Sequence, residues 1–142
     1  MQVLKILSDI WKSGAEIYRD ESDGRLALKN AKLVPVEVLK AAEPIFNQIE
    51  EWVKSWQGAS AVELTLQKIL HQFCGWQHNE KLNEWLCLEI DSLLLFDEWM
   101  ISLTKNGWND MYDDYRKFEN NESKVIAQEI YRLACAYAKK GV

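Results

Sequence analysis

The sequence predicts a mainly α-helical protein of the α+β class, with one β-hairpin near its N-terminus. Along most of the chain, apolar residues recur every three or four positions, which is the period of a helix buried on one face. Around the Asp-Gly pair at 23–24, apolar and polar residues alternate instead, which indicates two short strands and a turn. The patterns together predict an αββαα module over residues 1–57 and a unit of about four helices over residues 58–142.

The elements of the first module follow from local signals. Apolar residues at helical spacing predict a helix over residues 3–11, and Gly14 is placed to end it in a left-handed C-cap. Two strands alternate about Ile17 and about Leu26 and Leu28. Pro35 is expected to open the next helix and Pro44 to interrupt it, because a proline inside a helix removes a hydrogen bond and clashes with the preceding turn. A strongly amphipathic helix then runs to residue 56.

The second unit begins at a capping box, Ser60 to Glu63, which predicts a helix that Gly75 ends. A second helix is expected from a cap at Asn79 to about residue 104, and it is apolar on nearly every face. Such a helix is expected to be central and packed on several sides. A short helix near 110–119 and a last helix over 123–140 complete the unit. We expect the two parts to share a core and to unfold in one transition, because a module of 57 residues is close to the lower limit for an autonomous core.

Composition and charge exclude several classes of protein. Hydrophobic residues make up 48% of the chain and charged residues 27%, which suits a packed core rather than a disordered chain. The net charge is −5, with nine acidic and eight basic residues in 1–59 and thirteen acidic and nine basic residues in 60–142. Nucleic-acid binders usually carry a clustered basic excess, and none is present, so nucleic acid is disfavoured as a partner.

The placement of charged residues and the cysteine content predict a cytoplasmic protein. Charges at Lys5 and Asp9 interrupt the apolar N-terminal segment, so we expect no signal peptide. The most apolar stretch, 85–103, contains four carboxylates and would be costly to place in a bilayer, so no membrane span is expected. Three widely spaced cysteines do not form a disulfide framework and are interpreted as free thiols.

Residues 4–56 carry a further pattern: SGAEIY at 13–18, DGRLALKN at 23–30 and LVP at 33–35, with Leu39 and the segment 45–49 following. This pattern resembles the TubC-type N-terminal docking domain of bacterial nonribosomal peptide and polyketide synthase subunits. The resemblance implies an αββαα fold that often dimerises and that binds a short C-terminal peptide of another subunit on its hairpin. Val34 replaces the Thr or Ser that usually precedes the helix-opening proline, and a helical unit follows where a synthase domain would be expected.

No motif indicates catalysis or a cofactor. The chain contains no Gly-rich phosphate loop, no Walker-type lysine and no nucleophile elbow, so we expect no enzyme activity, no catalytic residues and no cofactor. The acidic groups at 97–98 and 110–114 are interpreted as solvated surface. One set of residues has the chemistry of zinc ligands, but bringing all four together requires a particular offset between two helices, so a zinc-stabilised module is only the weaker alternative. That set is His71, Cys74, His78 and Cys87.

Two groups of residues are candidates for binding a partner. Arg25 and Lys29 share one side of the predicted strand, with Lys32 after it, and could meet an acidic or extended peptide added at the strand edge. Three tryptophans are expected at helix ends or turns, where aromatic side chains serve as interface anchors. These are Trp11, Trp76 and Trp108.

The sequence therefore predicts a non-enzymatic adaptor or docking protein of bacterial type, whose partner is another protein or an extended peptide, with a homodimer as an alternative assembly. A second hypothesis is a phage- or plasmid-encoded inhibitor or accessory factor that acts on a bacterial enzyme such as a defence nuclease. In that case the acidic C-terminal half would occupy a basic groove.

Overall fold

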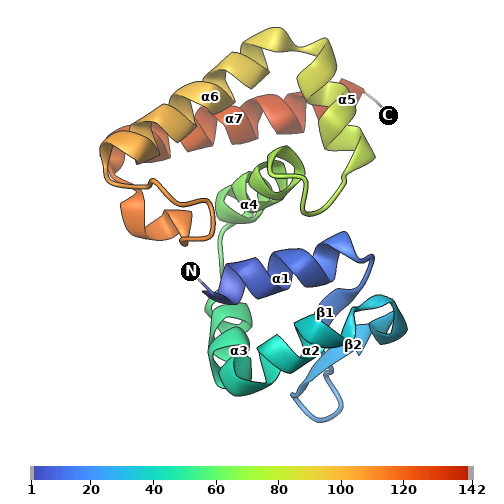
Figure 1. Ribbon diagram of the computed structural model, residues 1–142. Coiled ribbons are helices and arrows are strands. Elements are labelled where there is room, and N and C mark those ends of the chain that lie inside the picture. Colours follow the sequence, from blue (N-terminus) through green and yellow to red (C-terminus); the bar gives the residue numbers. More distant parts are fainter. Residues whose placement is uncertain (1, 141–142) are drawn as a thin grey trace. The chain divides into compact units, whose positions relative to one another are not determined.

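The computed structural model describes residues 2–140, and their contacts divide the chain into two units, 1–59 and 60–142. The hairpin unit (1–59) contains helix α1 (Gln2–Lys12), strands β1 (Glu16–Arg19) and β2 (Leu26–Lys29), helices α2 (Val36–Ala42) and α3 (Phe46–Ser55), and the short 3-10 turns η1 (Ala31–Leu33) and η2 (Glu43–Ile45) (Figure 1). The helical unit (60–142) contains α4 (Ala61–Phe73), α5 (Glu80–Leu88), α6 (Ile90–Lys105), the 3-10 turn η3 (Tyr115–Phe118) and α7 (Asn121–Lys140). The predicted class, mainly α with one β-hairpin, is confirmed.

Local signals place the elements of the hairpin unit. α1 ends at Lys12, and Gly14 follows with a φ of +93° that an L side chain rarely tolerates. The strands pair antiparallel in the register Ile17 opposite Leu28 and Arg19 opposite Leu26. The loop between them is longer than the Asp-Gly pair alone. A hydrogen bond from the amide of Asp20 to the carbonyl of Arg25, at 2.8 Å, closes it. Pro44 lies in η2 and separates α2 from α3, as the sequence predicts.

The core of the hairpin unit comes from its three helices and the hairpin. α1 packs against α2 and against α3, and Figure 1 shows α1 running across these two helices. Ile10 on α1 and Ile49 on α3 are each 1% exposed, so apolar burial holds the two helices together. Trp52 bridges Trp11 and Trp56, with ring centroids 6.2 and 5.8 Å from it.

In the helical unit, α6 lies along α7, and α4 also packs on α7 (Figure 1). The capping box predicted at the start of α4 is present: the amide of Glu63 donates to Ser60 Oγ at 3.1 Å, and the Glu63 carboxylate accepts from the amide of Ser60 at 3.3 Å. Trp99, Phe96 and Tyr115 form the aromatic centre, with the Trp99 ring 5.5 Å from Phe96 and 5.1 Å from Tyr115.

The predicted single helix from residue 79 to residue 104 is wrong. The chain leaves helical geometry at Glu89, with φ −115° and ψ 84°, so α5 and α6 are separate helices. No proline or glycine marks this break. α5 packs against both α4 and α6, and one straight helix over residues 79–104 could not make both contacts. We attribute the break to this tertiary packing, which overrides local helix propensity. The predicted short helix near 110–119 is also reduced to η3, a 3-10 turn preceded by turns.

The expectation that this region is packed on several sides is also wrong. α6 buries one face, through Ser92, Phe96, Trp99, Ser102 and Leu103. Its other face stays exposed within the described structure, with Ile90 61%, Leu94 58% and Ile101 48% accessible.

Candidate functional site

An apolar groove of about 290 Å³ lies between the hairpin and the helices of the hairpin unit. Ile10 and Ile49 form its buried base, and the strands supply Ile17 and residues 26–28. The wall opposite the strands comes from α2, η2 and α3. Its residues are Leu39, Ala42, Glu43 and Phe46.

The hairpin presents apolar side chains to this groove because of its register. Ile17 and Leu28 are directly opposite each other, so both side chains lie on the same face of the sheet, and Leu26 lies two residues along on that face. Ala27 also lines the groove, although its side chain belongs to the other face. The main chain of β2 therefore borders the groove together with its side chains.

The strands of this hairpin have open edges. The sheet formed by residues 2–140 contains β1 and β2 alone, so each strand pairs along one edge only. The N–H and C=O groups of the second edge are unused by the sheet, and an extended peptide can pair with such groups.

The helical wall combines exposure with a helical repeat. Leu39 and Phe46 remain 37% and 46% exposed, which is high for large apolar side chains that line a groove. Leu39, Ala42, Phe46 and Ile49 follow one another at steps of three, four and three residues, so the stripe continues across the Pro44 interruption. Glu43 is the one ionisable side chain of the lining. The groove therefore suits apolar side chains of a partner.

A basic hollow of about 280 Å³ adjoins the groove, and the two share Leu26. Arg19, Arg25 and Lys54 line the hollow against a single carboxylate, Glu50. The Arg19 side chain is oriented by a hydrogen bond from its Nε to the carbonyl oxygen of Gly24, at 3.2 Å. An excess of two positive charges in a concave surface favours a carboxylate-bearing partner.

The structure separates the basic residues that the sequence groups together. Arg25 lines the basic hollow, but Lys29 and Lys32 line neither the hollow nor the groove. Lys29 lies at the other end of β2, directly opposite Glu16 in the register. Lys32 is an exposed residue of η1. Sequence reasoning missed Arg19, which the hairpin pairing brings next to Arg25, and Lys54 of α3, which lines the same hollow.

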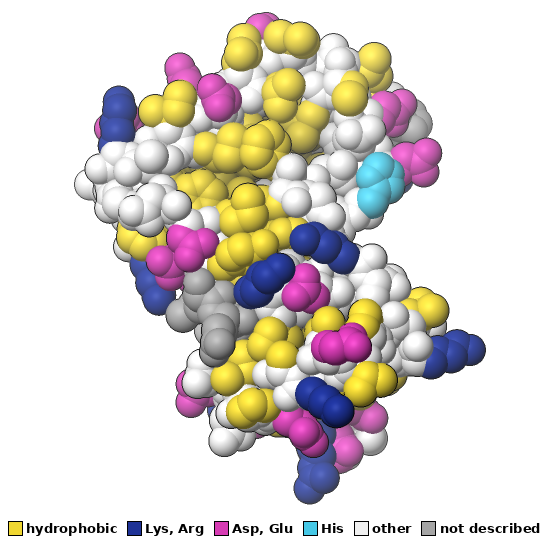
Figure 2. Space-filling view, in the orientation of Figure 1, with side chains coloured by type: hydrophobic (Ala, Val, Ile, Leu, Met, Phe, Trp, Pro, Cys, Tyr) yellow, Lys and Arg dark blue, Asp and Glu magenta, His cyan; other side chains and the backbone are white. Residues whose placement is uncertain are grey.

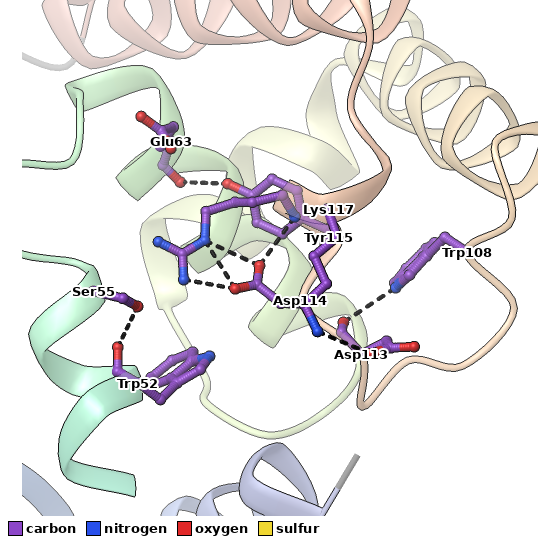
Figure 3. Close-up of polar contacts among 9 residues, drawn as sticks. Trp52, Ser55, Glu63, Trp108, Asp113, Asp114, Tyr115 and Lys117 are labelled. Atoms are coloured by element: carbon purple, nitrogen blue, oxygen red, sulfur yellow. Dashed lines mark hydrogen bonds and ion pairs between the residues drawn. The ribbon is translucent and has the colours of Figure 1, made fainter. Parts of the chain in front are cut away.

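The three candidate tryptophans differ in their surroundings. Trp11 is partly exposed at the end of α1 and contacts Trp52. Trp76 and Trp108 are 2% and 8% exposed, so the expectation that they anchor a surface contact is wrong. Trp76 stacks on Tyr112 at 5.5 Å with an interplanar angle of 8°, because the loop after α6 folds back over it. The indole Nε1 of Trp108 donates to the carbonyl of Asp113 at 3.2 Å (Figure 3).

The acidic residues near 110–119 build the turn that holds Tyr115. The Tyr115 hydroxyl donates to the carbonyl of Glu63 on α4, at 3.0 Å (Figure 3). Arg116 donates twice to Asp114 from Nε, at 3.0 Å to each oxygen, and its Nη2 donates at 2.6 Å. The Asp110 carboxylate accepts from the amide of Tyr112 at 2.9 Å, and this bond is the main cause that lowers the pKa of Asp110. The carboxylates of Asp110 and Asp114 therefore have hydrogen-bond partners within the turn itself.

The four residues with the chemistry of zinc ligands have separate surroundings in the structure. His71 is buried, and its Nδ1 lies 2.9 Å from Oε1 of Gln77. Cys74 is partly exposed at the end of α4, while Cys87 is exposed on α5 and His78 lies in the loop between the two helices. Within residues 2–140, no three side chains of His, Cys, Asp or Glu are grouped so that they could hold a metal ion.

Comparisons with protein-family models, with curated proteins and with solved structures found no match for this chain. None of the helices in the described part of the chain has the length and apolarity needed to cross a lipid bilayer.

Proposed function

We propose that this chain is a non-enzymatic protein-binding module that holds an extended peptide segment of another protein on its hairpin unit. The observation that carries the proposal is the pairing of an apolar groove with a basic hollow at Leu26, beside a strand with an open edge. The peptide adds to the sheet at β2 through its main chain. Its apolar side chains occupy the groove between the strands and Phe46, and a carboxylate lies near Arg25.

The resemblance to TubC-type docking domains supports this function, because that family binds a short C-terminal peptide on a hairpin of the same αββαα order. A C-terminal residue supplies the carboxylate that the basic hollow favours, since Arg19, Arg25 and Lys54 outnumber Glu50 there. Bacterial origin and a role as an adaptor between two proteins are part of the same proposal.

The test begins with peptides selected by display against the full chain, whose affinities are then measured by titration calorimetry. Phe46→Asp places a charge in the groove and is expected to weaken binding at least about tenfold. Val36→Asp is the matched control, because Val36 is 61% exposed and lies outside the groove. Equal affinities for Phe46→Asp and the unchanged protein would exclude the groove.

Charge reversal tests the hollow separately. Arg25→Glu is expected to weaken an acidic peptide several-fold and to leave stability within about 1 kcal/mol, because exposed charges contribute little to folding. Lys29→Glu and Lys32→Glu show whether the basic residues beyond the hollow contribute. A peptide N-methylated at every second residue tests strand addition, since methylation removes the donors that would pair with β2. Full affinity in both methylation registers would contradict strand addition.

A further inference from the structure

We infer that the outer face of α6 is a second docking surface, and that its occupant is a basic amphipathic helix of another protein. This face consists of Ile90, Leu93, Leu94 and Ile101, with Leu88 at the end of α5 beside it. It lies in the helical unit and is independent of the groove proposed above.

The apolar side chains of this face form one stripe. At 3.6 residues per turn, Ile90, Leu94 and Ile101 lie within roughly 40° of one another around the helix axis and span about 16 Å along it. Their exposed fractions are 61%, 58% and 48%. The opposite face of α6 already supplies the core through Phe96 and Trp99, each 0% exposed. The outer stripe therefore does not contribute to the core of the helical unit.

Side-chain charge identifies the class of occupant. Residues 89–104 contain four carboxylates, Glu89, Asp91, Asp97 and Glu98, and this segment contains no Lys or Arg. In Figure 2, several hydrophobic and acidic side chains are visible on the part of the surface where α6 lies in Figure 1. A partner that matches this face must bring apolar side chains flanked by positive charge.

The same charges disfavour three other occupants. A second copy of this face would bring four carboxylates against four, which is repulsive at close range. An anionic membrane surface and a nucleic acid would be repelled for the same reason. A helix fits better than an extended segment, because every backbone group in the middle of α6 is used within the helix and leaves no open edge.

The probe is a synthetic amphipathic peptide of about 18 residues, with leucine on one face and lysine on the flanks. Two controls accompany it: a peptide with glutamate in place of lysine, and a peptide with the leucines scrambled at constant charge. Binding to the full chain is measured by fluorescence anisotropy at low salt and at about 0.5 M NaCl. The lysine peptide is expected to bind at least about tenfold more tightly than either control and to lose affinity with salt.

Two protein variants locate the contact. The double variant Leu94→Gln/Ile101→Gln is expected to weaken the lysine peptide at least about tenfold. Asp97→Lys is expected to weaken it several-fold. The matched controls are Val125→Gln, an exposed apolar residue of α7, and Glu51→Lys, an exposed acid of α3, and both should bind as the unchanged protein does.

Several results would overturn the inference. One is equal binding of the lysine peptide and its scrambled form, which would show attraction to charge alone. Another is unchanged affinity in Leu94→Gln/Ile101→Gln. A third is a homodimer of the full chain in analytical ultracentrifugation that this double variant dissociates, because the occupant would then be a second copy.

Discussion

The groove of the hairpin unit and the outer face of α6 are both exposed and apolar, but they differ in what else they offer. The groove has one carboxylate, Glu43, a basic hollow beside it and a strand with an open edge. The α6 face has four carboxylates nearby and a backbone that is satisfied within the helix. The difference shows that similar apolar exposure can specify different partners, since the groove favours an extended acidic segment and the α6 face a basic helix.

The largest expected effect separates the two faces of α6. Trp99→Ala removes a fully buried ring that contacts Phe96 and Tyr115, and should lower the free energy of unfolding by about 3–5 kcal/mol. Leu94→Ala, at a site 58% exposed, should change it by less than about 0.5 kcal/mol. Urea denaturation measures both. A large loss in Leu94→Ala would show that the outer face serves folding instead of a partner.

A smaller loss of stability is expected when the glycine that follows a helix in each unit is replaced by alanine. Gly75, after α4, has a φ of +77° and open space around it, so Gly75→Ala should cost about 1–2 kcal/mol from backbone strain alone. Gly14, after α1, has a φ of +93°, and an added Cβ would lie 3.3 Å from Leu33 Cδ1. Gly14→Ala should therefore cost more, up to about 3 kcal/mol.

Thermal unfolding of the two glycine variants, followed by circular dichroism, gives the comparison. If Gly14→Ala were no more destabilising than Gly75→Ala, the Leu33 side chain would give way to the added methyl group at no energetic cost.

The smallest effect concerns pH and belongs to the helical unit. Burial lowers the pKa of the His71 imidazole, and its hydrogen bond with Gln77 offsets part of that shift. As the pH falls below about 6.5, the unfolded chain therefore takes up a proton before the folded protein does. The free energy of unfolding should decrease between about pH 6.5 and the lower folded pKa, by at most about 1.4 kcal/mol per pH unit.

Urea titrations between about pH 5 and 8 measure that slope. His71→Phe should flatten it, because the variant has no imidazole to protonate. An identical slope in the variant would assign the pH dependence to other groups.

The parts of the fold that depend on neighbouring residues were predictable from the sequence. Ser60 with Glu63, Gly14 and Pro44 each act within one or two turns, and the structure confirms the helix ends that they predict. The break at Glu89 was not predictable, because no local signal causes it and the packing of α5 on α4 and α6 does.

The candidate site was predictable only in part. Arg25 could be proposed from its place beside a strand, but Arg19 and Lys54 join it through tertiary packing. The stripe from Leu39 to Ile49 could have been found by its spacing, although nothing in it shows that a hairpin faces it. The tryptophans at 76 and 108 follow helices, and their burial depends on loops whose course the sequence pattern does not determine.

The exposed thiol of Cys87 gives this chain a ready attachment point for a reporter. Among the described residues it is the one exposed cysteine, since Cys74 and Cys135 are partly covered. It precedes Leu88 at the end of α5 and lies three residues before Ile90, the first residue of the α6 stripe. A dye attached there without any engineered substitution would report by its emission when a helix binds to that stripe.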